Sequence, residues 1–125
     1  MLQKLDNSSG PVVGYKVVGK VTVDDYKQLE PEIQALVDKH DDGVFVLLDL
    51  EEFTGEEVKA WLPDLKFGHR FHDKINKMAI VGDKRWEQWL TSLVHPFYAK
   101  EGKYFHTDDM DKAWAWLREK VADKG

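Results

Sequence analysis

NKMAIVGDKRWEQWLTSLVHPFY, residues 76–98, contains an apolar run, a polar break and an amphipathic stretch in direct succession. The unbroken apolar run from Met78 to Val81 is typical of a strand that is covered on both faces. Gly82 and Asp83 interrupt this run and supply a turn and a helix N-cap. The helix predicted after them carries its apolar residues on one side and its charged residues on the other. A buried strand joined to an amphipathic helix predicts an α/β architecture.

The first 21 residues predict an antiparallel hairpin. Apolar runs over 2–5 and 12–21 flank a polar turn that is rich in Asn, Ser, Gly and Pro. Gly14 and Gly19 lie inside the second run, where a glycine indicates a bulge or a close approach of another side chain. We therefore expect two strands, the second of them longer and irregular.

A first helix and the central strand follow the hairpin. Thr22 and Asp25 have the spacing of a capping box, with the acid at the third helical position. Pro31 is expected to kink or restart this helix, because proline lacks the main-chain donor that a helix interior needs. Residues 44–50 form the most apolar run of the chain, which predicts the central strand of the sheet.

Three further helices are predicted downstream. The spacing of Thr54 and Glu57 again matches a capping box, and the second helix that it opens is interrupted or redirected at Pro63. The third helix lies in the opening stretch, after Asp83. Thr107 or Asp108 is expected to cap the last helix.

This order of elements predicts the α/β class. We expect a single mixed, mostly parallel sheet of about five strands, with an N-terminal hairpin, four helices and residues 103–106 as an edge strand. A chain of 125 residues corresponds to one domain over 1–125, which can bury an ordinary core without disulfides or a structural metal.

The composition excludes several classes of function. The absence of cysteine rules out disulfide scaffolds, cysteine-based zinc sites, iron–sulfur clusters and thiol catalysis. The net charge of −5 argues against nucleic-acid binding, which needs a basic footprint. The longest apolar stretch is far shorter than a membrane span, and the N-terminal sequence does not resemble an export signal. We therefore expect a cytoplasmic protein with no membrane span.

Aromatic residues gather on and just after the predicted second and third helices, in a region that is also locally basic. Residues 66–85 hold six Lys or Arg against two Asp. The aromatic set comprises Trp61, Phe67, Phe71, Trp86, Trp89, Phe97 and Tyr98. These rings either fill the core, which we favour for Trp89, or line a ligand pocket or a subunit contact. The basic excess is either a solvated helix face or a site for an anion or a membrane surface.

Asp49 is the candidate polar residue of the sheet, because it interrupts an apolar strand near its C-terminal end. A charged group is costly to bury alone, so Asp49 either meets a basic partner or points into the cleft where open α/β sheets place ligands. His69 and His72 are three residues apart and could share a metal ion, but no third ligand is positioned by the sequence. No catalytic triad, Gly-rich phosphate loop or close carboxylate pair is recognisable, so we expect neither an enzyme nor a cofactor or metal site.

Several segments together resemble the bacterial STAS-like family that is related to the anti-sigma-factor antagonist SpoIIAA and has also been compared with CRAL-TRIO lipid-binding domains. They are GKVTVDDYKQLEPEI, VLLDLEEFTG, MAIVGDKRWEQWL with HPFY, and YFHTDDMDKAWAWL. The resemblance implies a small, often dimeric α/β domain whose relatives act as non-enzymatic regulators or carry apolar ligands. Such regulators are switched by phosphorylation of a serine after the central strand. Here the loop over 51–55 has no serine, and Thr54 is its nearest hydroxyl.

The sequence thus predicts a non-enzymatic STAS-like domain. Its aromatic, locally basic surface is expected to bind an apolar small molecule or lipid, a peripheral membrane surface, or a protein partner such as an identical subunit in a homodimer. The alternative is a phosphorylation-switched regulator of the anti-sigma-factor-antagonist type that uses Thr54. In the competing structural interpretation, the Thr54 hydroxyl serves only as a helix N-cap.

Overall fold

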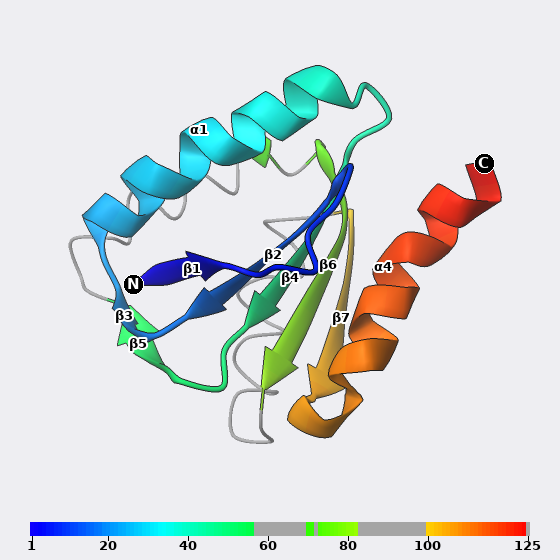
Figure 1. Cartoon of the computed structure of the whole chain (residues 1–125). Coiled ribbons are helices and arrows are strands. Elements are labelled where there is room, and N and C mark those ends of the chain that lie inside the picture. Colours follow the sequence, from blue (N-terminus) through cyan, green and yellow to red (C-terminus); the bar gives the residue numbers. More distant parts are fainter. Residues whose placement is uncertain (57–69, 72, 83–99, 125) are drawn as a thin grey trace.

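The computed structural model describes residues 1–56, 70–71, 73–82 and 100–124, and its centre is a five-stranded sheet (Figure 1). In order across the sheet, the strands are β1 (Leu2–Lys4), β2 (Val12–Val17), β4 (Val44–Asp49), β6 (Ile75–Gly82) and β7 (Glu101–His106). β1 pairs antiparallel with β2, and the other neighbours are parallel. The predicted hairpin, the mixed sheet, the central strand and the edge strand are all confirmed.

A second, two-stranded sheet was not predicted. β3 (Gly19–Val21) pairs in parallel with β5 (Phe53–Glu56). Gly19, with a φ of +72°, is the first residue of β3, and the register shifts between Gly19 and Lys20, which confirms the expected irregularity. The predicted helix N-cap at Thr54 is wrong, because Thr54 lies within β5. Phe53 and Gly55, on either side of Thr54, pair with β3, and such tertiary pairing overrides a local capping signal.

The first helix, α1 (Val23–Lys39), begins as the capping box predicts. The Thr22 hydroxyl accepts a hydrogen bond from the Asp25 amide at 3.2 Å, and the Asp25 carboxylate accepts one from the Thr22 amide at 2.9 Å. Pro31 lies inside α1 without restarting it. Because proline has no N–H, the Lys27 carbonyl lacks the helical hydrogen bond that residue 31 would otherwise donate. Both residues are exposed, so water can supply the missing donor.

The C-terminal helix, α4 (Met110–Lys124), follows a short 3₁₀ turn, η2 (Thr107–Asp109). His106 caps this turn, since its Nδ1 accepts a hydrogen bond from the Asp108 amide at 3.3 Å. The predicted caps, Thr107 and Asp108, are therefore wrong by one or two residues, because the chain turns before the α-helix begins. The described residues contain two of the four expected α-helices, α1 and α4. The other two predictions fall mainly on 57–69 and 83–99, outside the described residues.

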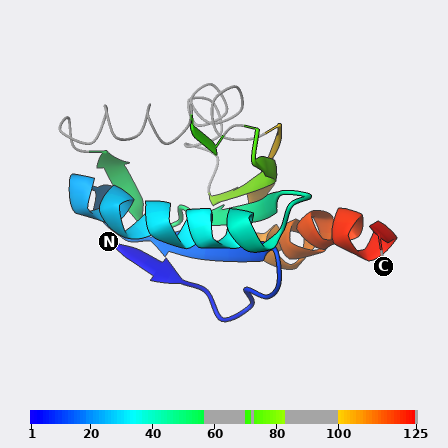
Figure 2. The ribbon, with the colours of Figure 1, turned by 90° about the horizontal axis from the view of Figure 1, so that it is seen from above.

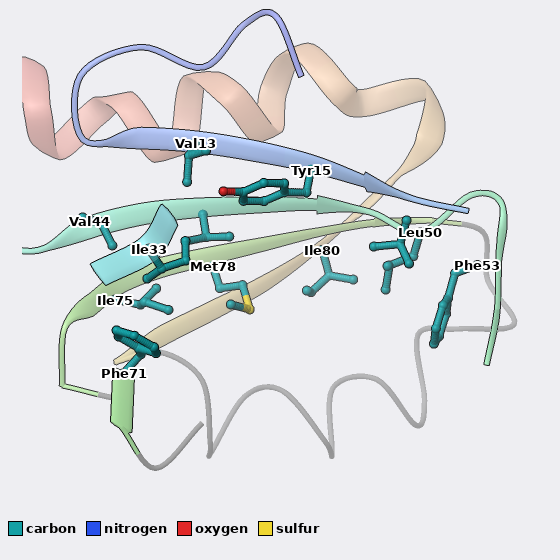
Figure 3. Packing of buried hydrophobic residues seen from close by; sticks show 12 residues of the cluster. Val13, Tyr15, Ile33, Val44, Leu50, Phe53, Phe71, Ile75, Met78 and Ile80 are labelled. Carbon is teal, nitrogen blue, oxygen red and sulfur yellow. The ribbon is translucent and has the colours of Figure 1, made fainter. Parts of the chain in front are cut away.

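The two helices cover opposite faces of the sheet (Figures 1 and 2). On the α1 face, Ile33 packs with strand residues such as Val13, Val46 and Met78, as Figure 3 shows in part. The α4 face has its own cluster, which includes Leu47, Ala79, Trp114 and Leu117. No helix in the described part of the chain is both long and apolar enough to cross a membrane.

Gly14 explains how α4 approaches the sheet so closely. A Cβ atom at this position would lie only 2.8 Å from Cζ2 of the Trp114 ring, closer than real Cβ atoms come to a neighbour. Glycine therefore leaves the space that the indole occupies. This confirms the close packing expected at Gly14.

Candidate functional site

A row of four side chains crosses the α1 face of the sheet. The register aligns Tyr15 of β2, Leu48 of β4, Ile80 of β6 and Tyr104 of β7. Tyr15 and Ile80 are buried, whereas Leu48 and Tyr104 are only partly buried. Every other residue of β4 is buried. The exposure of Leu48 is unusual, because a central strand is flanked on both sides and covered on both faces.

We call Tyr15, Leu48, Ile80 and Tyr104 the open row. Partly buried apolar side chains of α1 border the same core cluster: Tyr26, Leu29, Leu36 and Val37. Solvent therefore reaches apolar surface on both the sheet and the helix that covers it. Partly exposed apolar side chains beside a core form the kind of surface that hydrophobic ligands bind.

A polar pair accompanies the open row. The Tyr15 hydroxyl donates a hydrogen bond to Oε2 of Glu32 on α1 at 2.7 Å. Burial of the ring, followed by the hydrogen bond and the negative charge of Glu32, raises the pKa of Tyr15 far above its usual value. Tyr15 is thus a neutral donor in an otherwise apolar layer. Among the side chains drawn in Figure 3, the Tyr15 oxygen and the Met78 sulfur are the only atoms other than carbon. The site combines apolar area with one oriented hydrogen bond.

Asp49 lies at the C-terminal end of β4 and is 6% exposed. Its Oδ1 accepts a hydrogen bond from the Glu51 amide at 3.1 Å, which closes the turn after the strand. Its register partner on β2 is Lys16, which forms an ion pair with Glu52. The pKa of Lys16 is raised, first by Glu52 and to a lesser extent by Asp49 and Glu51. Among the described residues, the hydrogen bond of Asp49 is therefore to the Glu51 amide, while Lys16 pairs with Glu52, and both alternatives for Asp49 stay predictions.

Phe71, from the predicted second helix, is 1% exposed and belongs to the α1-face cluster. The neighbouring Arg70 lies on the surface, with its guanidinium 5.1 Å from the Phe71 ring centre. Its Nη2 donates to Oε1 of Gln34 at 2.7 Å, and its Nη1 lies 3.9 Å from the Glu30 carboxylate. Residues 70–71 are therefore docked against α1, and Phe71 serves in packing.

The other aromatic candidates lie outside the described residues: Trp61, Phe67, Trp86, Trp89, Phe97 and Tyr98. So do His69 and His72, and of Thr54 only the backbone position in β5 is described. Within the described ranges, no group of three or more His, Asp or Glu side chains could hold a metal ion. The structure therefore brings Phe71 and Asp49 into the core and leaves the remaining aromatic predictions as predictions.

The open row was not predicted. Leu47 and Leu48 are identical in type, and no feature of the run over 44–50 distinguishes the closed position from the open one. The Tyr15–Glu32 hydrogen bond joins residues 17 positions apart. A tyrosine within an apolar strand was the only available signal, since a buried tyrosine hydroxyl usually finds a partner.

Comparisons with known proteins agree on the fold. A family model described as SpoIIAA-like matches residues 12–118. The crystal structure of an uncharacterized DUF3478-family protein with a SpoIIAA-like fold from Shewanella loihica PV-4 is 26% identical, with a TM-score of 0.75 over 94% of this chain and 92% of that one. Unphosphorylated anti-sigma factor antagonist SpoIIAA, at 8% identity, matches 95% of this chain and 99% of its own with a TM-score of 0.60, and shows the fold alone. No curated protein matches the sequence.

Proposed function

The chain belongs to the SpoIIAA-like family, and on that premise we propose that it is a non-enzymatic STAS-like domain that binds an apolar or amphipathic ligand on the α1 face. The ligand would lie over the open row. The aromatic, locally basic surface predicted for the second and third helices would form its border. The proposal thus locates the ligand site at the open row on the α1 face of the sheet.

The partial exposure of Leu48 is the observation that carries the proposal. Leu48 lies in the middle strand of five, between the buried Tyr15 and Ile80 of the neighbouring strands. Each Å² of apolar surface that stays accessible forgoes about 25 cal/mol of the stabilisation that burial would provide. An apolar ligand would recover this free energy by covering Leu48 and Tyr104.

The polar groups at the site favour an amphipathic ligand over a purely apolar one. The Tyr15 hydroxyl already donates to Glu32, which leaves the Tyr15 oxygen and the Glu32 carboxylate as acceptors beside the open row. Arg70 adds a positive charge where residues 70–71 meet α1. A ligand with an apolar body and a polar or anionic end would satisfy both kinds of surface.

The strand order favours the same face for the predicted second and third helices. β2, β4, β6 and β7 are parallel and follow one another in a single direction across the sheet. Right-handed connections between such strands fall on one face, and α1, which connects β2 with β4, defines it. We therefore expect both helices, with their aromatic residues, to border the open row.

A fatty-acid titration with a blocking variant tests the proposal. Leu48→Trp fills the accessible space above β4, and Ala35→Trp adds the same indole at an exposed position of α1. We expect the parent protein and Ala35→Trp to bind a fluorescent fatty-acid analogue saturably. Leu48→Trp should bind at least tenfold more weakly while keeping the circular dichroism spectrum of a folded chain.

Three outcomes of the titration would lead to different conclusions. A parent protein that shows no saturable binding, and from which mass spectrometry extracts no ligand, would contradict the carrier function. Equal binding by Leu48→Trp and Ala35→Trp would remove the open row as the site. A ligand extracted from the parent protein but not from Leu48→Trp would support the proposal and identify its chemical class.

Self-association remains a prediction of the family resemblance. If the aromatic surface is a homodimer contact, light scattering should report twice the monomer mass, and Trp86→Ala should return it to that of a monomer without unfolding. A parent protein that stays monomeric at every concentration would exclude this contact. The regulatory alternative predicts a phosphorylated Thr54, which intact-mass analysis of protein from its native cell would detect.

A further inference from the structure

Two lysines meet one tryptophan on the α4 face, away from the open row. Lys77 of β6 is 7% exposed, and its ammonium donates a hydrogen bond to the Trp116 carbonyl at 3.0 Å. The same ammonium lies 4.5 Å from the Trp116 ring centre. Lys103 of β7 is exposed, and its ammonium lies 5.9 Å from that ring centre and 5.2 Å from the ring centre of Phe105. We call Lys77, Lys103 and Trp116 the lysine–indole cluster.

The positive charge of this cluster has no anionic partner in the part of the chain that the structure describes. No described carboxylate lies within 4.0 Å of either ammonium. Glu101, the register partner of Lys77, is exposed and forms no ion pair there. The indole face and one carbonyl compensate a buried ammonium only in part, because burying a charge without a counter-charge is costly. Both ammonium groups lie within 5.9 Å of the Trp116 ring centre, so an anion beside that ring would be attracted by both.

The cluster also keeps unused hydrogen-bond donors. Each lysine ammonium has three N–H groups. The Lys77 ammonium uses one of them on the Trp116 carbonyl, and the Lys103 ammonium forms no hydrogen bond to another described residue. Lys77 is held in place by the sheet and by α4, whereas the exposed Lys103 is accessible from solvent. An incoming anion therefore meets one fixed cation and one adaptable cation.

We infer that Lys77 and Lys103 bind a phosphate group, with the Trp116 ring as the apolar wall beside it. Two ammonium charges match a phosphate dianion better than a single carboxylate, and lysine is a typical point-charge ligand for phosphate. The ligand class is a small phosphorylated molecule or a phospholipid headgroup. This site is separate from the proposed function, because it lies on the opposite face of the sheet.

Titration with inorganic pyrophosphate and a matched pair of variants tests the inference. Lys103→Gln removes one charge from the cluster, and Lys100→Gln removes one from an exposed position three residues earlier. We expect Lys103→Gln to weaken binding in isothermal titration calorimetry at least tenfold and Lys100→Gln to change it less than twofold. Neither variant alters a buried residue, so both should fold.

A second readout reports on Lys77 directly. The ¹⁵N-labelled ammonium of the buried Lys77 should shift in NMR spectra as pyrophosphate is added to the parent protein. Phosphatidylcholine vesicles with and without phosphatidic acid form a second arm, which distinguishes a lipid headgroup from a soluble phosphate. Binding in either arm that depends on Lys103 supports the site. The absence of binding in both arms, or equal effects of the two variants, overturns it.

Discussion

Two neighbouring rows of the same sheet differ in how they are covered. On the α4 face, the register aligns Gly14, Leu47 and Ala79, where small residues on either side of a leucine leave room for the indole of Trp114. On the α1 face, the next row contains Tyr15 and Leu48, and Leu48 keeps contact with solvent. The row on the α4 face is closed by interlocking side chains, whereas the row on the α1 face keeps an accessible position at Leu48. Neighbouring rows of one sheet can thus serve different purposes, because the first closes the core and the second leaves apolar surface accessible.

The sharpest test compares adjacent leucines. Leu47 is fully buried, so Leu47→Ala removes packed methyl groups and leaves a cavity, at a cost of about 2–5 kcal/mol. Leu48→Ala removes a side chain that is partly hydrated already and should cost about 1 kcal/mol. Urea unfolding of both variants measures the difference. Equal losses would mean that the two faces are equally closed.

Gly14→Ala tests the interlock on the α4 face. The added methyl group must displace the Trp114 ring, and overpacking of this kind costs about 1–3 kcal/mol. The same substitution in a Trp114→Leu background should cost less, because the smaller side chain leaves space for the methyl group. Urea unfolding of the four proteins gives the coupling energy. An unchanged cost in both backgrounds would contradict the steric explanation.

Tyr15→Phe probes the polar part of the α1 face and should have the smallest effect, about 1 kcal/mol at neutral pH, from loss of the Glu32 hydrogen bond. Folding raises the pKa of Tyr15 above its usual 10.0, so the unfolded chain loses this proton first. The contribution of Tyr15 is therefore complete below pH 10.0 and is lost as the pH rises further. Urea midpoints of parent and variant should converge above that pH. A constant difference would contradict the raised pKa.

Apolar patterning made the sheet predictable. The run over 44–50 is apolar except for Asp49, as expected of a strand with both faces covered, and this marks it as the central strand. The capping box of Thr22 and Asp25 was equally informative, since both of its hydrogen bonds are local. These signals depend on neighbours in sequence, and they correctly located β4 and the start of α1.

The remaining features depend on distant neighbours. Thr54 matched a local capping pattern, but residues 53–56 pair instead with 19–21, far away in sequence. The contact between Lys77 and the Trp116 carbonyl joins residues 39 positions apart. Exposure of Leu48 likewise depends on what lies above the sheet and not on its own chemistry. Both candidate sites arise from contacts of this kind, which periodicity does not encode.

The small β3–β5 sheet has a mechanical consequence. β3 ends one residue before Thr22, the N-cap of α1, and β5 follows the turn after the central strand. Main-chain pairing therefore fastens the segment after β4 to the first turn of the helix that covers the open row. A binding event that displaces residues 53–56 would therefore shift the N-terminal end of α1. Because α1 packs on the face of the sheet that carries Leu48, the accessibility of Leu48 would change with it.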